Sequence, residues 1–514
     1  MSKNSFSYAL ANPLSVMLDK PAEDFQRADF FKIIEQKQIE RLTFHYTALD
    51  GKLKELKLPV SNQDQADLIL AEGERVDGSS LFKGMVDSAL SDLYVVPVYK
   101  TAFLNPFDSR SLDFICRYLT RDGKRAPFAV DNILAKACDI FLENTDFEFH
   151  CLGELEFFLI SEKELDIFPL GKRGYHESSP FVKSGNILNE MIRFLAQMTG
   201  AVKYAHSENG SIDCLQSELE EIRGKRAEQL EVEFQSKPVA EMADHLVLGR
   251  WLIRNVAYQH SCVATFLPKI EEGVPGNGMH FHLELKKNGQ SHMLSSDGKL
   301  SEFALHLIGG LCEYADSLTA FGNTVSSSYL RLVPDQEAPT RIFWSNLNRD
   351  ALIRVPLGWS FGPNLARILN PQAKDEGGKT ESRQTVELRS PDGSALIHLL
   401  LAGLVMAAEW GFKDDRSLAV AKKLYTKREA IKNKKHLDAF PRLPASCVES
   451  SRILLKKRDL YERGGIFPAG IIEYVAKILK AEDDERISQK LQELPDEKRL
   501  KEARNIMHRY LHIH

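Results

Sequence analysis

The sequence lacks the cysteine patterns of a zinc finger and of a disulfide-bonded secreted domain. Its seven cysteines are odd in number, scattered along 514 residues and free of CxxC spacing: Cys116, Cys138, Cys151, Cys214, Cys262, Cys312 and Cys447. Isolated cysteines of this kind are typical of reduced thiols in a cytoplasmic protein. We therefore expect a cytoplasmic location and no thiolate metal site.

The sequence also lacks a long hydrophobic run and an excess of basic residues. Its most apolar stretch, residues 399–408, is shorter than the roughly 20 residues that a membrane helix needs. Charged residues at 19–24 precede any long apolar run, which argues against a signal peptide. A net charge of -5 provides no basic surface for a polyanion. We expect small-molecule chemistry, with neither nucleic acid nor a membrane as partner.

No internal repeat, low-complexity segment or long flexible linker is present. A chain of this length, with 43% hydrophobic and 27% charged residues, suits a soluble globular protein of two or more domains. Residues 41–49 and 52–60 flank Asp50-Gly51, which predicts a β-hairpin with a type I′ turn. The other elements expected before a domain boundary near Pro127 are helices over 24–39 and 63–71 and a strand over 93–98.

The second part of the chain predicts further helices over residues 131–142, 188–198 and 242–260. The last residues, 481–514, are charged and favour a helix, and their apolar residues are only loosely spaced. This pattern is typical of a solvated helical appendage, which is our expectation for the tail.

The most informative stretch is residues 153–160, where Glu154 and Glu156 interrupt an apolar, β-favouring run. Positions i and i+2 of a strand share a face, so both carboxylates point the same way while Leu155 and Phe157 point into a core. Two like charges held so close repel each other unless a cation neutralises them. The alternative for one such stretch alone is an ordinary half-exposed strand with both glutamates in water.

The same i, i+2 arrangement of ionisable groups recurs three more times, at Glu231-Val232-Glu233, His280-Phe281-His282 and Glu387-Leu388-Arg389. Four strands aiming such groups inward would form a polar funnel, which is unfavourable for stability because buried charge is costly unless it is paired. A functional metal site is the better explanation. The ligands are mainly carboxylates with one or two imidazoles, so we favour Mg²⁺ or Mn²⁺ over zinc.

Five motifs stand in one order along the chain, with WS at 344–345, NR at 348–349 and IRVP at 353–356 between the last two. They are VDGSS (76–80), GELEFF (153–158), GMHFH (278–282), YLRLVPDQEAP (329–339) and VELRSPD (386–392). In order and approximate spacing, residues 40–478 resemble glutamine synthetase, nearest the bacterial type I enzymes.

The resemblance implies an α+β fold, with a small N-terminal β-grasp domain and a large catalytic domain whose antiparallel sheet forms a metal-lined funnel. It divides the chain into residues 1–126 (N-terminal extension and β-grasp domain), 127–480 (catalytic domain) and 481–514 (helical tail). It also implies ATP-dependent joining of glutamate to ammonia through γ-glutamyl phosphate. The sites would lie between neighbouring subunits of a homo-oligomeric ring, a dodecamer of two hexamers or a single hexamer.

The resemblance also implies roles for individual residues. One metal site matches Glu156, Glu208 and Glu231, and the second matches Glu154, His280 and Glu387. Glutamate-contacting positions match Gly276, Arg331, Glu337 and Arg389, and nucleotide-phosphate positions match His282, Arg349 and Arg354. The catalytic positions are Asp77, which receives ammonium from the adjacent subunit, Glu337, which takes a proton from it, and Arg349. Arginine suits these roles because its planar group grips carboxylate or phosphate with two hydrogen bonds.

Three departures from the family pattern bear on the substrate. An insertion rich in Glu, Lys and Arg separates His206-Ser207-Glu208 from Glu231. The loop before the histidine strand reads Pro275-Gly276-Asn277-Gly278 and lacks an asparagine that contacts glutamate in the family. Glu284 stands where a nucleotide-contacting serine is common.

Three hypotheses follow from this comparison. The first is a glutamine synthetase, and the second is a γ-glutamyl ligase that uses an organic amine or polyamine in place of ammonia. The third is a catalytically weak relative retained as a ring-forming binding protein. The intact charged residues Glu154, His280 and Glu387 argue against the third, because a relic has no physical reason to keep buried charges.

Overall fold

The computed structural model describes residues 8–86, 91–163, 174–333, 338–358, 365–372, 382–431 and 434–513. Its N-terminal part is a six-stranded sheet in the order β2-β1-β6-β4-β3, with β5 paired to β6. β1 runs parallel to β6 and the other pairs are antiparallel. The strands are β1 (Arg41–Thr47), β2 (Leu53–Pro59), β3 (Glu74–Asp77), β4 (Asp92–Pro97), β5 (Phe103–Leu104) and β6 (Ser111–Leu119).

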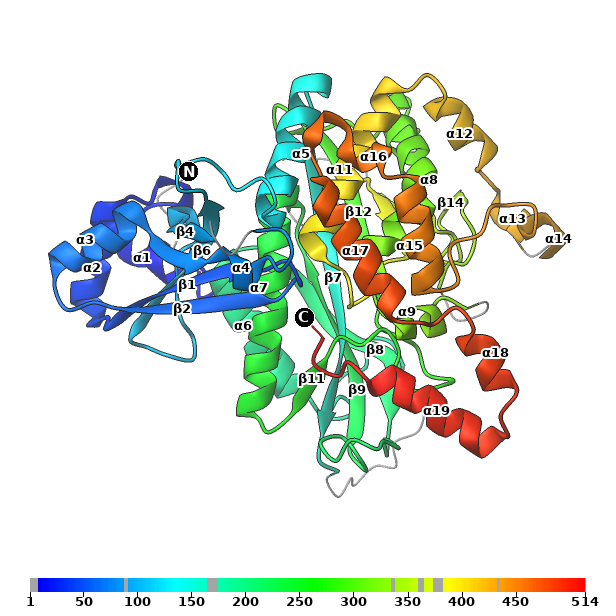
Figure 1. The fold of residues 1–514 in the computed structure, drawn as a ribbon, viewed down its shortest axis with the longest axis horizontal. Coiled ribbons are helices and arrows are strands. Elements are labelled where there is room, and N and C mark those ends of the chain that lie inside the picture. Colours follow the sequence, from blue (N-terminus) through cyan, green and yellow to red (C-terminus); the bar gives the residue numbers. More distant parts are fainter. Residues whose placement is uncertain are drawn as a thin grey trace.

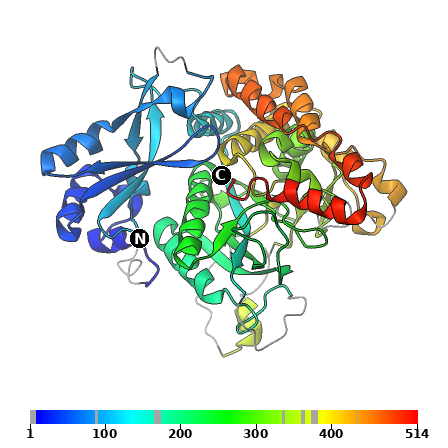
Figure 2. The same ribbon diagram turned by 60° about the horizontal axis from the view of Figure 1, so that its bottom comes forward.

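The helices of this part pack around the sheet and connect its strands. They are α1 (Pro13–Leu18), η1 (Ala22–Asp24), α2 (Arg27–Lys37), α3 (Gln63–Glu72), α4 (Gly78–Leu81) and η3 (Tyr99–Thr101). In both views this blue domain lies to one side of the larger remainder of the chain (Figures 1 and 2). Arg117 of β6 crosses between the two parts and donates a hydrogen bond to Asp244, 2.5 Å away.

The expected β1–β2 hairpin is present, with Thr47 paired to Leu53, but the prediction of a type I′ turn is wrong. That turn needs positive φ at both central residues, and here only Gly51 has it, at 78°. The Gly51 N–H donates to the Ala48 carbonyl (3.0 Å), so the loop is longer by one residue and ends in a left-handed glycine. A dipeptide alone could not distinguish these two loops.

The larger part contains a ten-stranded sheet in the order β14-β15-β16-β12-β7-β9-β8, with β10 and β11 paired to β7 and β13 to β12. All its pairs are antiparallel except β14–β15. The strands are β7 (Glu148–Ser161), β8 (Val202–Ile212), β9 (Arg226–Phe234), β10 (Lys237–Pro238), β11 (Val263–Thr265), β12 (Phe281–Lys287), β13 (Gln290–Ser291), β14 (Trp344–Asn346), β15 (Ile353–Val355) and β16 (Val386–Leu388).

Helices pack against one side of this sheet and against one another, and α11 lies between α5 and α8 (Figure 1). The expected α+β architecture is therefore confirmed. None of the described helices is long and apolar enough to cross a membrane. The helices are α5 (Val130–Thr145), α6 (Gly185–Thr199), α7 (Val239–Gln259), α8 (Glu302–Gly322), α9 (Ser326–Arg331), α10 (Leu365–Leu369), α11 (Ile397–Lys413), α12 (Ser417–Lys423), α13 (Arg428–Ile431), α14 (Lys434–Leu437), α15 (Cys447–Lys456), α16 (Asp459–Glu462), η4 (Arg463–Gly465) and α17 (Ala469–Ala481).

The C-terminal tail forms α18 (Ile487–Gln492) and α19 (Asp496–His508), and it is not the solvated appendage that its composition predicts. Ala503, Ile506 and Met507 are buried, and the chain then runs back to end near β11 (Figure 1). The prediction failed because the charged residues of α19 pair with acidic residues elsewhere in the fold, which the tail sequence alone does not reveal.

Candidate active site

Six neighbouring strands of the large sheet border a cavity of about 1050 Å³. Twelve of the fourteen site residues predicted from the sequence line this cavity: Glu154, Glu156, Glu208, Glu231, Gly276, His280, His282, Arg331, Arg349, Arg354, Glu387 and Arg389. The expected funnel is thus one continuous space in the structure.

The register of three strands sets one wall of the cavity. Glu156 on β7 stands opposite Glu231 on β9, and Glu231 stands opposite His206 on β8. Glu154 likewise stands opposite Glu233. Directly opposite side chains on one face lie roughly 4.5–5.5 Å apart at their Cβ atoms, so this register gathers four carboxylates and one imidazole.

The other wall comes from β12, β16 and β15. His282 pairs in register with Glu387, and Glu387 pairs with Arg354. Arg354 donates to Glu387 Oε2 (2.7 Å), and Arg389, one residue beyond β16, donates to Glu387 Oε1 (2.5 Å). Glu387 is almost completely buried, yet the neighbouring His282 and Arg389 charges outweigh burial and lower its pKa.

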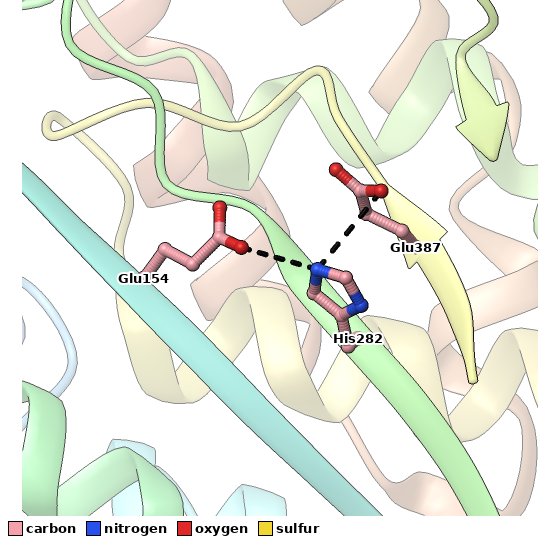
Figure 3. Close-up of side chains that lie close together, drawn as sticks. All are labelled: Glu154, His282 and Glu387. Carbon is pink, nitrogen blue, oxygen red and sulfur yellow. Dashed lines mark hydrogen bonds and ion pairs between the residues drawn. The ribbon is translucent and has the colours of Figure 1, made fainter. Parts of the chain in front are cut away.

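Glu154 is the point where the two walls meet. It accepts hydrogen bonds from His280 Nδ1 (2.7 Å) and from His282 Nε2 (3.1 Å). Figure 3 shows His282 between the carboxylates of Glu154 and Glu387. The His282 Nε2 atom is 3.9 Å from Glu387 Oε2. Burial alone would raise the pKa of Glu154, but these hydrogen bonds and imidazole charges hold it well below its usual range.

At Glu208 and Glu231, no comparable positive charges or hydrogen bonds offset the effect of burial on the pKa. Burial and the negative charge of Glu156 and Glu154 raise the pKa of Glu208 to about 7. Burial and the same two glutamates also raise the pKa of Glu231. His206 lies 3.6 Å from Glu231 and 3.7 Å from Glu208, but burial lowers its pKa, so it adds little positive charge. This end of the funnel therefore carries negative charge that only protons or a bound cation can balance.

The acidic and imidazole groups fit a divalent cation. Four sets of three ligand atoms lie within 4.8 Å of one another: Glu154, His282 and Glu387; Glu154, Glu156 and His280; His206, Glu208 and Glu231; and Glu154, Glu231 and Glu233. His280 Nε2 is buried without a hydrogen-bond partner, which is the state expected of an imidazole nitrogen kept for a metal.

These sets differ in two respects from the two sites that the resemblance implies. Glu208 and Glu231 share a set with His206 and not with Glu156, which is grouped with Glu154 and His280. The implied second site joins Glu154 and Glu387 to His280, whereas the set of three that contains Glu154 and Glu387 has His282 as its third member. His280 Nδ1 still lies 3.9 Å from Glu387, so both imidazoles flank the same two carboxylates. The reason is the β12–β16 register, which sets His282 and not His280 opposite Glu387.

The arginines of the cavity are held by the backbone. Arg331 donates to the carbonyl oxygens of Ser390 (2.9 Å) and Arg389 (3.4 Å), and it is 5% exposed. Arg389 donates to the carbonyl of Arg349 (3.0 Å). The guanidinium of Arg349 lies 6.0 Å from the centre of the Tyr175 ring. Arg331 and Arg389 are therefore held in place by backbone carbonyls, and Arg389 is also paired with Glu387.

Of the predicted residues that the structure describes, Asp77 does not line this cavity. Asp77 is exposed in the N-terminal domain, where it caps α4 and accepts hydrogen bonds from Ser80 Oγ (2.6 Å) and from Ser79 Oγ (2.7 Å) and N–H (2.9 Å). The hydrogen bonds from Ser80 and Ser79 lower the pKa of Asp77 to about 2. Glu337 lies outside the described residues.

The sequence reasoning missed two residues of the site, Gln229 and Tyr175. Gln229 Nε2 donates to the Gly276 carbonyl (3.0 Å), Asn277 Oδ1 (3.1 Å) and Glu156 Oε2 (3.2 Å). Its alternation with Glu231 and Glu233 on β9 could have identified it. Tyr175 lines the cavity beside Arg349, but nothing in its local sequence indicates this position.

Comparison with known proteins agrees with this architecture. The family model "Glutamine synthetase, beta-Grasp domain" matches residues 38–121, and "Glutamine synthetase, catalytic domain" matches residues 131–494. The glutamine synthetase of Pyrococcus horikoshii is 32% identical over 73% of this chain and 75% of its own. That of Pyrococcus abyssi is 30% identical over 84% and 88%, and that of Methylococcus capsulatus 28% over 87% and 93%.

Solved structures share the fold at lower identity. Plasmodium falciparum glutamine synthetase has a TM-score of 0.68 and 21% identity, covering 92% of this chain and 98% of that one. A GmaS/ADP complex also has a TM-score of 0.68, at 20% identity, covering 91% and 97%.

The fold and the matched domains define the class: this is an ATP-dependent carbon–nitrogen ligase that works with Mg²⁺ or Mn²⁺. The chain belongs to the glutamine synthetase family.

Removing one ligand of the funnel tests its function. We expect Glu154→Ala and His280→Ala each to lower activity about a hundredfold or more, because the cation site is weakened. Thermal stability should be retained in Glu154→Ala, because the loss of one carboxylate also relieves repulsion. Glu148→Ala, at the exposed end of the same strand, is the control. Unchanged turnover in either funnel variant would show that the cavity is not the active site.

The raised pKa of Glu208 predicts that metal binding releases protons. Below about pH 7 this carboxyl holds a proton that the cation must displace, so Mn²⁺ affinity should rise as the pH rises from 6 to 8. Calorimetry of Mn²⁺ binding in buffers of different ionisation enthalpy measures the release. Glu208→Gln should reduce the number of protons released, and Glu220→Gln, on an exposed side chain, should not. Equal binding heats in all buffers would contradict the assignment.

Proposed function

We propose that the chain joins L-glutamate to ammonia, with ATP hydrolysis, through γ-glutamyl phosphate. The observation that carries this proposal is a single cavity lined both by buried carboxylates and by arginines that backbone carbonyls hold in place. Phosphoryl transfer requires mainly positioning and neutralisation of charge, and these groups provide both.

The carboxylates and imidazoles would hold two cations. Glu156, Glu208 and Glu231 form the first proposed set, and Glu154, His280 and Glu387 form the second. Bound Mg²⁺ or Mn²⁺ supplies neutralisation of the phosphate oxygens. The raised pKa values of Glu208 and Glu231 support the first set, because their negative charge is not offset within the chain, and the unpartnered Nε2 of His280 supports the second.

The arginines would bind the anionic ends of the substrates. Arg331 and Arg389, with Gly276, face the proposed glutamate side, and Arg349, Arg354 and His282 the proposed phosphate side. A guanidinium held by backbone carbonyls keeps its position before substrate arrives, which reduces the entropy lost on binding. The proton acceptor from ammonium would be Glu337.

Asp77 supports an assembly in which a neighbouring copy completes each site. Its carboxylate is exposed, ionised and ordered by Ser79 and Ser80, yet it does not line the cavity of its own chain. Head-to-tail contacts between copies close into a ring by rotation, so we propose a hexamer or a dodecamer of two hexamers. The seven cysteines are all free, which supports a reducing, cytoplasmic location.

An organic amine remains the second candidate for the acceptor because of an aromatic cluster beside Glu208. The ring of His176 stacks on Tyr175 at 3.9 Å and lies 4.0 Å from His206, which itself contacts Glu208. An alkyl amine needs such an apolar wall beside a carboxylate, whereas ammonium needs only converging carboxylates. Asp77 and Glu337 stand in their motifs as in ammonia-using members, and this favours ammonia.

The acceptor is tested by ADP release with glutamate and a panel of nitrogen donors. We expect saturable, glutamate-dependent release with ammonium, and weaker release with methylamine, ethylamine or putrescine. Mass spectrometry of the product should identify glutamine. Product formation only with an organic amine, and none with ammonium at saturating glutamate and ATP, would promote the second candidate.

A shared site predicts complementation between two inactive variants. Asp77→Ala should lose amide formation but still bind ATP and Mn²⁺, because only ammonium capture is affected. When it is co-expressed with Glu154→Ala, about a quarter of the interfaces carry both intact residues, and about a quarter of wild-type activity should return. Co-expression of Glu154→Ala with His280→Ala should restore none. An active monomer in light scattering, or no recovery from the first pair, would disprove the shared site.

A further inference from the structure

Three parts of the chain that depart from the family pattern meet at one place. They are the inserted segment 213–225 between β8 and β9, the loop 266–276 that leads to Gly276, and the last residues 495–513, which lie beyond the end of the family match at residue 494. We propose that residues 495–513 form a strap that holds the glutamate side of the active site in its binding geometry. This inference rests on the proposed function and gives it a positioning element.

The strap contacts the loop 266–276 through three side chains of α19. Arg499 donates to Glu272 (2.5 Å), Arg504 donates to Glu271 (2.9 Å), and His508 Nε2 donates to the Ile270 carbonyl (2.8 Å). Beyond the helix, Thr265 Oγ donates to the Leu511 carbonyl (2.8 Å). Four contacts from residues 499–511 of the strap therefore hold Thr265, at the end of β11, and three consecutive residues of the loop, Ile270, Glu271 and Glu272.

The strap also contacts the inserted segment 213–225. His508 Nδ1 lies 3.0 Å from Ser217 Oγ, and Lys501 forms an ion pair with Glu218 (3.0 Å). Leu511 is buried in a small apolar cluster with Leu215 and Ile222. The insertion therefore has a packing partner that the family match does not include.

His508 is the side chain that contacts both the loop 266–276 and the inserted segment. It is 3% exposed, and burial lowers its pKa, which favours the neutral ring. A neutral ring has one donor and one acceptor nitrogen, so Nε2–H donates to the Ile270 carbonyl and Nδ1 accepts from the Ser217 hydroxyl. The single ring thus connects the loop to the insertion.

Backbone and side-chain hydrogen bonds connect the loop 266–276 to the active site. Asn277 donates through its N–H to the Pro268 carbonyl (3.0 Å) and through its amide to the Leu267 carbonyl (2.8 Å). The Gly276 carbonyl then accepts from Gln229, which also donates to Glu156. A Cβ at Gly276 would stand 2.2 Å from the Pro268 carbonyl oxygen, so the two stretches of backbone are in direct contact.

A second route leads from the strap to Arg331. Ala503, Ile506 and Met507 pack with Leu330, the residue before Arg331 at the end of α9. Glu482 accepts hydrogen bonds from the N–H (3.0 Å) and hydroxyl (2.6 Å) of Ser326 at the start of α9, and from the Tyr510 hydroxyl (2.5 Å). Both proposed glutamate-side elements, Gly276 and Arg331, are thus supported by the tail.

The first experiment separates a positioning role from general stability. We expect His508→Ala to raise the KM for glutamate about fivefold, which corresponds to the loss of one net hydrogen bond, with the KM for ATP unchanged. His508→Gln keeps a donor for the Ile270 carbonyl and should recover most of the loss. Lys498→Ala, on the exposed side of α19, should behave as the wild type. An unchanged KM for glutamate in His508→Ala, or equal rises for both substrates, would overturn the proposal.

The second experiment does not depend on catalysis. Hydrogen exchange of residues 266–277 should be faster in His508→Ala than in the wild type, and it should be unchanged in Lys498→Ala. If the wild type shows no glutamate-dependent ADP release, the proposed function fails while this measurement still decides the strap. Unchanged exchange in His508→Ala would overturn the strap even in an active enzyme.

Discussion

Repulsion among carboxylates that are buried together in one cavity is the constraint on which the rest of the structure depends. Strand register places Glu154, Glu156, Glu231 and Glu233 side by side on two neighbouring strands, where water cannot screen them. Such a group of charges is unfavourable unless other charges balance it. The arrangement of the surrounding strands, and of the arginines that line the same cavity, follows from how that balance is divided.

The negative charges are neutralised to different extents across the sheet, and this difference is the basis of function. Glu154 and Glu387 are balanced within the chain by imidazoles and arginines, and their pKa values are lowered. Glu208 and Glu231 have raised pKa values, so their balance must come from outside the chain. A site whose negative charge was fully neutralised by its own side chains would have no affinity for a cation. A site with no neutralising side chains would not fold around four glutamates.

Features that depend on local periodicity could be predicted from the sequence, whereas features that depend on pairing between distant segments could not. The alternation at Glu154 and Glu156 correctly predicted a shared inward face. That His282, and not His280, stands opposite Glu387 depends on the β12–β16 register, which has no local signal. The tail is a similar case. Its helices are local, but their packing depends on Glu271 and Glu272, more than two hundred residues earlier in the chain.

The two sides of the active site are supported by different means. The carboxylate side lies mainly on strands, and backbone pairing holds Glu154, Glu156, Glu231 and Glu387 in register. The glutamate side depends on the loop 266–276, which leaves the sheet after β11 and has no strand partner until β12. A loop of this length must obtain hydrogen bonds from elsewhere or lose the geometry that binding requires. Contacts from α19 supply them, so a C-terminal helix performs for one side of the site what strand pairing performs for the other.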